Sequence, residues 1–166
     1  MTLFTSATTG IAVALTLAAS ANAQSLKQQL VGSWILVSSD TTPATGAKRQ
    51  DFGANPKGIL ILEADGRYAV VQGQPNRPKF KDTTNLRLGS TDAEYAAAAR
   101  AFAANFGTWS VNEADKTLIR KYEIALIPNN DSVESKASVN LTGEELKLVA
   151  TSSAGVRSDT VYRRAK

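Results

Sequence analysis

The chain has 166 residues, a net charge of +4, and neither cysteine nor histidine. The two absent residue types exclude disulfides and thiol nucleophiles, the commonest general base, and the ligands of nearly all zinc sites. The sequence also lacks the glycine motifs that bind phosphates and dinucleotides. We therefore assign no catalytic residue, no metal and no cofactor.

The first 23 residues have the pattern of a signal peptide. Residues 11–19 form an apolar core that is shorter than the roughly 20 residues needed to span a bilayer. Ala21-Asn22-Ala23 then matches the small-x-small pattern that signal peptidase accepts, although no Lys or Arg precedes the core. A buried N-terminal helix is the alternative. We predict cleavage before Gln24 and a single mature domain, residues 24–166, that is periplasmic or secreted. No second long apolar run follows, so we expect no stable membrane insertion.

The mature chain consists mainly of short strand patterns separated by turn signals. Asp65-Gly66 predicts a hairpin turn, because glycine accepts positive φ there. Eight short, evenly spaced strands favour a closed antiparallel barrel over an open sheet, since closure removes exposed sheet edges. We expect the barrel to be a monomer or a weak oligomer. The interior of such a barrel holds packed side chains or one small ligand. The predicted strands are residues 32–39, 58–64, 68–72, 108–111, 117–127, 133–140, 145–151 and 158–164.

One helix interrupts this strand pattern. Residues 91–94 match a capping box, and the alanine-rich run that continues to Asn105 has high helix propensity. Gly107 is expected to end the helix. The polar, proline-bearing connection at residues 73–90 is predicted to fold over one mouth of the barrel. Four residues at helical spacing would form the apolar face of the helix: Tyr95, Ala98, Phe102 and Phe106.

Basic residues gather in the same connection. It holds a single aromatic residue, Phe80, whereas nucleic-acid surfaces combine several aromatics with a denser basic stripe. We therefore predict a solvated loop and no nucleic-acid partner. The basic residues are Arg77, Lys79, Lys81 and Arg87.

Several short segments follow one another in a specific order and spacing. They are residues 30–37 (LVGSWILV), 52–53 (FG), 55–60 (NPKGIL), 65–68 (DGRY), 76–80 (NRPKF), 106–109 (FGTW), 125–129 (ALIPN), 143–148 (GEELKL) and 162–163 (YR). Together they resemble a bacterial lipocalin-like domain family. The resemblance implies an all-β, eight-stranded antiparallel lipocalin-like barrel with one α-helix inserted between strands. Arg120 and Lys121 stand where members often carry histidines, and Val161 stands where many carry tryptophan.

The Gly32-Ser33-Trp34 step opens the first predicted strand. We expect Trp34 to plug one end of the barrel. The resemblance further implies that an arginine of the last strand stacks across the indole. Arg163 is the candidate for this arginine, and its neighbour Arg164 is the alternative.

The strand at residues 117–127 carries the candidate binding site. If Leu118, Ile124 and Leu126 face inward, the strand period of two also turns Arg120 and Tyr122 inward. The predicted site is an apolar pocket with a few polar groups, as is usual for a small-ligand site. The alternative is a packed barrel in which Arg120 pairs with Glu63 or Glu134, and Trp109 could equally belong to a plain core. The predicted ligand-binding residues are Arg120, Tyr122, Tyr68, Gln72 and Trp109.

The inward Arg120 favours an acidic amphiphile, such as a fatty acid or an aromatic acid, as partner. We therefore predict an exported barrel that binds a small, partly apolar molecule. One alternative is an envelope interaction protein with a filled barrel, which would use residues 73–90 as its contact surface. Another is a cofactor-free isomerase or cyclase in which Tyr and Arg side chains shape the substrate.

Overall fold

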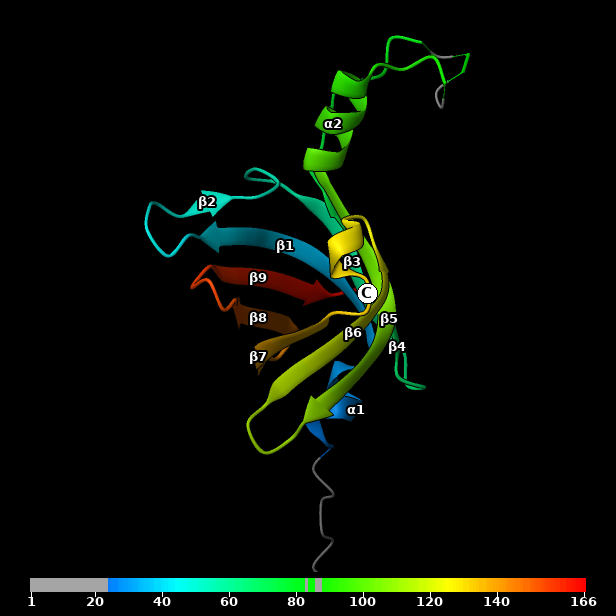
Figure 1. The fold of residues 1–166 in the computed structure, drawn as a ribbon. Coiled ribbons are helices and arrows are strands. Elements are labelled where there is room, and N and C mark those ends of the chain that lie inside the picture. The colour runs from blue at the N-terminus through cyan, green and yellow to red at the C-terminus, as the bar shows by residue number, and fades with distance from the viewer. Residues whose placement is uncertain (1–23, 83, 86–87) are drawn as a thin grey trace, which may run out of the picture.

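Strand-forming segments of the chain close into one antiparallel barrel (Figure 1). The computed structural model describes residues 24–82, 84–85 and 88–166. The predicted signal peptide lies outside these residues, as does Arg87. The elements are α1 (Leu26–Leu30), β1 (Gly32–Thr42), β2 (Arg49–Gln50), β3 (Lys57–Leu62), β4 (Arg67–Gly73), α2 (Asp92–Arg100), β5 (Phe102–Asn112), β6 (Thr117–Ala125), η1 (Pro128–Asn130), β7 (Glu134–Thr142), β8 (Glu145–Thr151) and β9 (Arg157–Arg164).

The barrel closes because β1 pairs with two strands that lie far apart in sequence. It pairs with β3 along one edge and with β9 along the other. From β3 onward each strand pairs antiparallel with the next, while the two-residue β2 forms only a short hairpin with the end of β1. The predicted eight-stranded barrel, with a helix inserted between strands, is therefore confirmed.

A single apolar core fills the half of the barrel next to α1. Alternate side chains of each strand point inward, as the period of two requires. Trp34, Leu60 and Leu118 are fully buried in this core. Leu30 of α1 is also fully buried, so the short helix closes this end. The carboxylate of Glu113 holds α1 in place by accepting hydrogen bonds from the backbone N–H groups of Leu26 and Lys27, at 2.9 Å each.

The predicted helix begins where expected but ends early. Thr91 and Glu94 form the expected capping box at the start of α2. The helix ends at Arg100, and the prediction that it continues to Asn105 and ends at Gly107 is wrong, because β5 begins at Phe102. No residue of α2 is buried, and Figure 1 shows α2 standing beyond the barrel wall in line with β5. The described part of the connection at residues 73–90 extends along α2 and away from the barrel, with the ring of Phe80 5.3 Å from that of Tyr95, so the prediction that it folds over one mouth is wrong.

A β-bulge interrupts the alternation of β6. Gly107 pairs with Tyr122, whereas the adjacent Phe106 pairs with Ile124, so Glu123 is the extra residue. A bulge of this kind reverses the inward and outward positions beyond it. Ile124 and Leu126 accordingly point outward, with 57% and 38% of their surfaces exposed. The prediction that both face the interior is therefore wrong.

Candidate functional site

Trp34 closes the α1 end of the barrel. Its indole N–H donates a 2.9 Å hydrogen bond to the carbonyl of Leu30. The guanidinium carbon of Arg164 lies 4.1 Å from the ring centroid, a cation–π arrangement. Arg163 is therefore not the stacking arginine: it is exposed, because it alternates with the buried Tyr162 and points away from the core. Gly32 has a φ of +128°, which residues with a Cβ rarely adopt, and a Cβ there would also lie 3.3 Å from the guanidinium of Arg164.

The other half of the barrel contains a cavity of about 340 Å³. It lies beyond the apolar core, toward the end where the β1–β2 and β8–β9 connections are found (Figure 1). Most of its lining is polar, in contrast to the predicted apolar pocket with few polar groups. The polar lining residues are Ser39, Asp51, Gln72, Asn105, Arg120, Tyr122, Ser135, Ser158, Thr160 and Tyr162. The apolar ones are Phe52, Val70, Ala103, Ala137, Leu148 and Ala150.

Arg120 is the one cation in this lining. Its Nε atom is buried and has no hydrogen-bond partner among the described residues. The alternative of a packed barrel needs Arg120 to pair with Glu63 or Glu134. In the described part of the chain neither carboxylate lies within 4.0 Å of this guanidinium, and Glu134 pairs with Lys136 at 3.3 Å instead. Among the residues that the structure describes, Arg120 thus has no counter-ion.

Aromatic side chains surround Arg120. Its guanidinium carbon lies 5.7 Å from the ring centroid of Tyr68, and that ring lies 6.4 Å from the ring of Tyr122. Burial raises the pKa of Tyr162 to about 12, and it raises the pKa of Tyr68 even further, although the charge of Arg120 opposes both shifts. Both phenols therefore keep their protons at neutral pH. The hydroxyl of Tyr68 donates to Asn105 at 2.9 Å.

Two of the remaining predicted site residues lie in different places. Gln72 lines the cavity, and its side-chain oxygen accepts a long hydrogen bond of 3.5 Å from Tyr162. Trp109 does not line the cavity: it is buried in the core, and its indole N–H donates to the carbonyl of Glu63 at 2.9 Å. The structure thus brings Arg120, Tyr122 and Gln72 together around the cavity. Tyr68 lies next to Arg120 and Tyr122 but outside the lining, and Trp109 is also outside it, although Trp109 pairs with Arg120 across the β5–β6 ladder.

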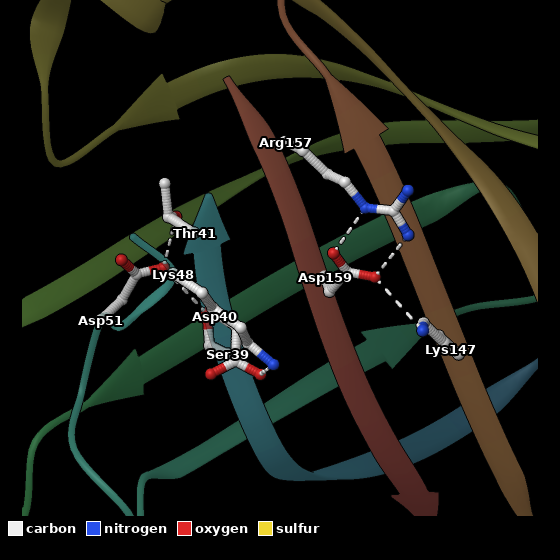
Figure 2. A network of polar contacts seen from close by, with 8 residues as sticks. All are labelled: Ser39, Asp40, Thr41, Lys48, Asp51, Lys147, Arg157 and Asp159. Carbon is white, nitrogen blue, oxygen red and sulfur yellow. Dashed lines mark hydrogen bonds and ion pairs between the residues drawn. The ribbon is translucent and has the colours of Figure 1, made fainter. Parts of the chain in front are cut away.

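Sequence reasoning did not find the acidic member of the lining, Asp51. This residue follows β2 and folds back against β1, where its backbone N–H donates to the carbonyl of Ser39 at 3.0 Å. Its carboxylate accepts hydrogen bonds from the hydroxyls of Thr41 at 2.8 Å and Ser39 at 3.4 Å, as Figure 2 shows for Thr41. The one sequence signal for this site is that Ser39 and Thr41 lie on the same face of a strand. It does not identify Asp51, because Asp51 reaches these hydroxyls only through the β1–β2 hairpin.

A second polar cluster lies on the outside of the same strands. Asp159 receives two hydrogen bonds from Arg157, at 2.7 and 2.9 Å, and an ion pair from Lys147 at 3.2 Å (Figure 2). The bonds from Arg157 lower the pKa of Asp159 to about 2. Directly across the ladder Asp40 pairs with Lys48 at 2.9 Å. Each carboxylate thus has its own cation, and this cluster is complete without a ligand.

The described residues contain no cluster of three or more acidic side chains suited to a metal ion. Within the same residues, no helix has the length and apolarity that crossing a bilayer requires. The polar groups that line the cavity are hydroxyls, amides, one guanidinium and one carboxylate.

The comparison with protein families agrees with this geometry. Residues 31–164 match the model of the lipocalin-like domain, which covers the whole barrel. The chain belongs to the lipocalin-like domain family. No curated protein matches it.

Solved structures similar to this lipocalin-like domain include designed barrels and a fluorescent protein. One is a redesigned β-barrel with 14% identity, 86% of this chain and 100% of that chain covered, and a TM-score of 0.43. Another is a de novo designed fluorescence-activating β-barrel, with 10% identity, coverage of 86% and 100%, and a TM-score of 0.43. A mutant of the fluorescent protein UnaG has 14% identity, coverage of 83% and 97%, and a TM-score of 0.37.

Proposed function

We propose that this lipocalin-like domain binds a small acidic molecule inside its barrel, with Arg120 as the anchor for the acidic group. The observation that carries the proposal is the buried Nε atom of Arg120, which has no partner among the described residues. Removing a charged group from water costs several kcal/mol of free energy unless the group gains a partner of opposite charge. An arginine that served only the fold would be expected to have a carboxylate partner. A ligand carboxylate would supply the missing charge.

The surroundings of Arg120 suit a flat, bidentate anion. The planar guanidinium matches the geometry of a carboxylate better than a lysine ammonium does. The protonated hydroxyl of Tyr162 and the side-chain amide of Gln72 offer further hydrogen bonds within the same cavity. Val70, Leu148 and Phe52 provide apolar surface for the rest of the ligand. The combination favours an amphiphilic acid over a wholly apolar molecule.

Matched ligands on matched variants test the proposal. Isothermal titration would compare octanoate with the neutral 1-octanol on the wild type, on Arg120→Leu and on Lys121→Leu. Lys121 is the control because it is exposed and is the next residue of β6. We expect Arg120→Leu to weaken octanoate binding at least tenfold, because a hydrogen bond to a charged group contributes about 1.5–3 kcal/mol. Binding of 1-octanol should stay within about twofold on all three proteins, given that 1.4 kcal/mol corresponds to tenfold.

The same variants separate binding from folding. Replacing this partly buried, unpaired cation with leucine should leave the empty protein at least as stable as the wild type. A structural role for Arg120 predicts the opposite, a clear loss of stability. Equal losses of octanoate and 1-octanol binding in Arg120→Leu would refute the anchor. No binding of any acid to the wild type would favour a barrel that acts through its outer surface.

We also propose that the domain is exported to the periplasm or beyond. The support is the apolar core at residues 11–19, which is followed by a small-x-small cleavage site. Mass spectrometry of the protein isolated from its own cells is expected to give an N-terminus at Gln24. An N-terminus at Met1 would contradict export.

A further inference from the structure

The cavity contains one carboxylate as well as one guanidinium, and the two lie on opposite walls. In the order of the barrel, three strands separate β1 from β6 in either direction: β3, β4 and β5 on one side, and β9, β8 and β7 on the other. Arg120 is on β6, and Asp51 is held against β1 by Ser39 and Thr41. Asp51 and Arg120 are more than 4.0 Å apart, since they form no ion pair in the described chain. The cavity is therefore acidic on one wall and basic on the other.

The carboxylate of Asp51 has acceptor capacity to spare. Both hydroxyl donors, Thr41 and Ser39, reach the same oxygen, Oδ2. Among the described residues, the other oxygen, Oδ1, is approached only by Nε of Arg49, at the long distance of 3.4 Å. The Arg49 side chain is 68% exposed, and exposed ion pairs of this kind contribute little. A ligand group that donates hydrogen bonds can therefore displace Arg49 from Oδ1.

On one side of the barrel, the strands between Arg120 and Asp51 carry several hydroxyl groups that face the cavity. Ser135 lies on β7, and Ser158 and Thr160 lie on β9, so they connect the Arg120 wall to the Asp51 wall. The side chains of these three residues make no hydrogen bond within the described chain, which leaves them available to a polar ligand. A fatty acid with a plain hydrocarbon tail would leave these hydroxyls and Oδ1 of Asp51 without partners. Burying polar groups without partners is unfavourable, so such a tail fits this wall poorly.

We infer that the ligand has two polar ends: an acidic group that Arg120 binds and a distal hydrogen-bond donor, such as an amine or other N–H group, that Asp51 accepts. This inference rests on the proposed function, because the acidic end is the end assigned to Arg120. It narrows the ligand class from amphiphilic acids in general to acids that carry a donor at the far end. The separation of the two walls then also selects the length of the ligand.

An ω-amino acid is the appropriate probe, because its ammonium group can only donate. Titration calorimetry would compare octanoate with 8-aminooctanoate on the wild type and on Asp51→Asn. The asparagine oxygen can still accept hydrogen bonds from the hydroxyls of Thr41 and Ser39. Its NH₂ group takes the place of Oδ1, and because both this group and the ligand ammonium are donors, no hydrogen bond can form between them. We expect Asp51→Asn to weaken 8-aminooctanoate binding at least tenfold and to change octanoate binding by less than twofold. Arg49→Ala should strengthen 8-aminooctanoate binding, since it removes the competing cation.

A second measurement does not depend on the variant folding. On the wild type, affinity for ω-amino acids of five to twelve carbons should pass through a maximum at one length, because the two walls are fixed. Affinity for the plain acids should rise steadily with length. If Asp51→Asn affects both probes equally or neither of them, or if the ω-amino acids show no preferred length, the inference is overturned. The proposed function still stands in that case, provided that octanoate binding depends on Arg120, and it fails separately if that dependence is absent.

Discussion

Replacing Trp34 with alanine is expected to remove much of the stability of the barrel. Trp34 is the largest fully buried side chain and packs where α1 meets the core. Truncating a buried aromatic residue to alanine costs about 3–5 kcal/mol. The change also leaves the carbonyl of Leu30 without its 2.9 Å partner, which adds about 1 kcal/mol, and removes the cation–π contact of Arg164, which is worth about 0.5–2 kcal/mol. The total, about 4.5–8 kcal/mol, is comparable with the whole stability of a domain at the lower end of the usual range of about 5–15 kcal/mol.

Urea unfolding followed by far-UV circular dichroism measures this loss without relying on the fluorescence of the deleted residue. Trp34→Phe is the matched control, because it keeps most of the ring but cannot donate to Leu30. It should lose only about 1–2 kcal/mol, the value of the hydrogen bond and part of the packing. An unchanged unfolding midpoint for Trp34→Ala would refute the claim that Trp34 closes and stabilises this end of the barrel. Equal losses for the alanine and phenylalanine variants would refute the division into packing and polar contributions.

Three further substitutions test other parts of the account. Arg164→Leu should lower the unfolding midpoint, while Arg163→Leu should leave it unchanged; equal effects would refute the assignment of the stacking arginine. Gly107→Ala should cost about 1–3 kcal/mol, because a Cβ there would overlap the backbone of Lys121 at the bulge; a loss no greater than that of the exposed Ser110→Ala would contradict this. The pKa of Asp159 is lower in the folded state than in the unfolded state, so its contribution is complete above about pH 4 and is lost as the pH falls toward 2. The wild type should therefore exceed Asp159→Asn in urea midpoint at pH 7, and the gap should narrow by pH 2.5; a constant gap would be contrary to expectation.

The strand count and the closed barrel could be predicted because turn signals and alternation are local. The end of α2 could not be, since residues four apart share a face in a helix and also in a strand. Phe102 and Phe106 therefore fit both readings, and only the pairing of β5 with β4 decides between them. The position of Gly107 after an alanine-rich run predicts a helix end, whereas in the structure the glycine provides room for the bulge. The α1 helix was missed although Ser25 and Gln28 carry a capping-box signal, because a five-residue helix has too short a pattern to stand out.

The cavity was predictable on β6 up to the bulge and unpredictable beyond it. Alternation from Leu118 correctly places Arg120 and Tyr122 inside, and the extra residue Glu123 then turns Ile124 outward. The position of a bulge depends on how the strand pairs with its partner, so the residue pattern of β6 alone does not predict it. Asp51 was missed for a similar reason: its position depends on hydrogen bonds to β1 across a hairpin. Local pattern thus predicts which residues share a strand face, while long-range pairing decides which faces meet.

The central claim, that Arg120 holds the acidic end of a ligand, is tested most directly by its own side-chain NMR signal. The Nε–Hε resonance of Arg120 can be assigned as the one missing from Arg120→Leu. We expect this resonance to shift when octanoate is added and to stay in place when 1-octanol is added, because only the carboxylate supplies a charge partner for the guanidinium. If octanoate binds to the protein but the Nε–Hε resonance of Arg120 does not shift, the claim that Arg120 holds the acidic group is contradicted.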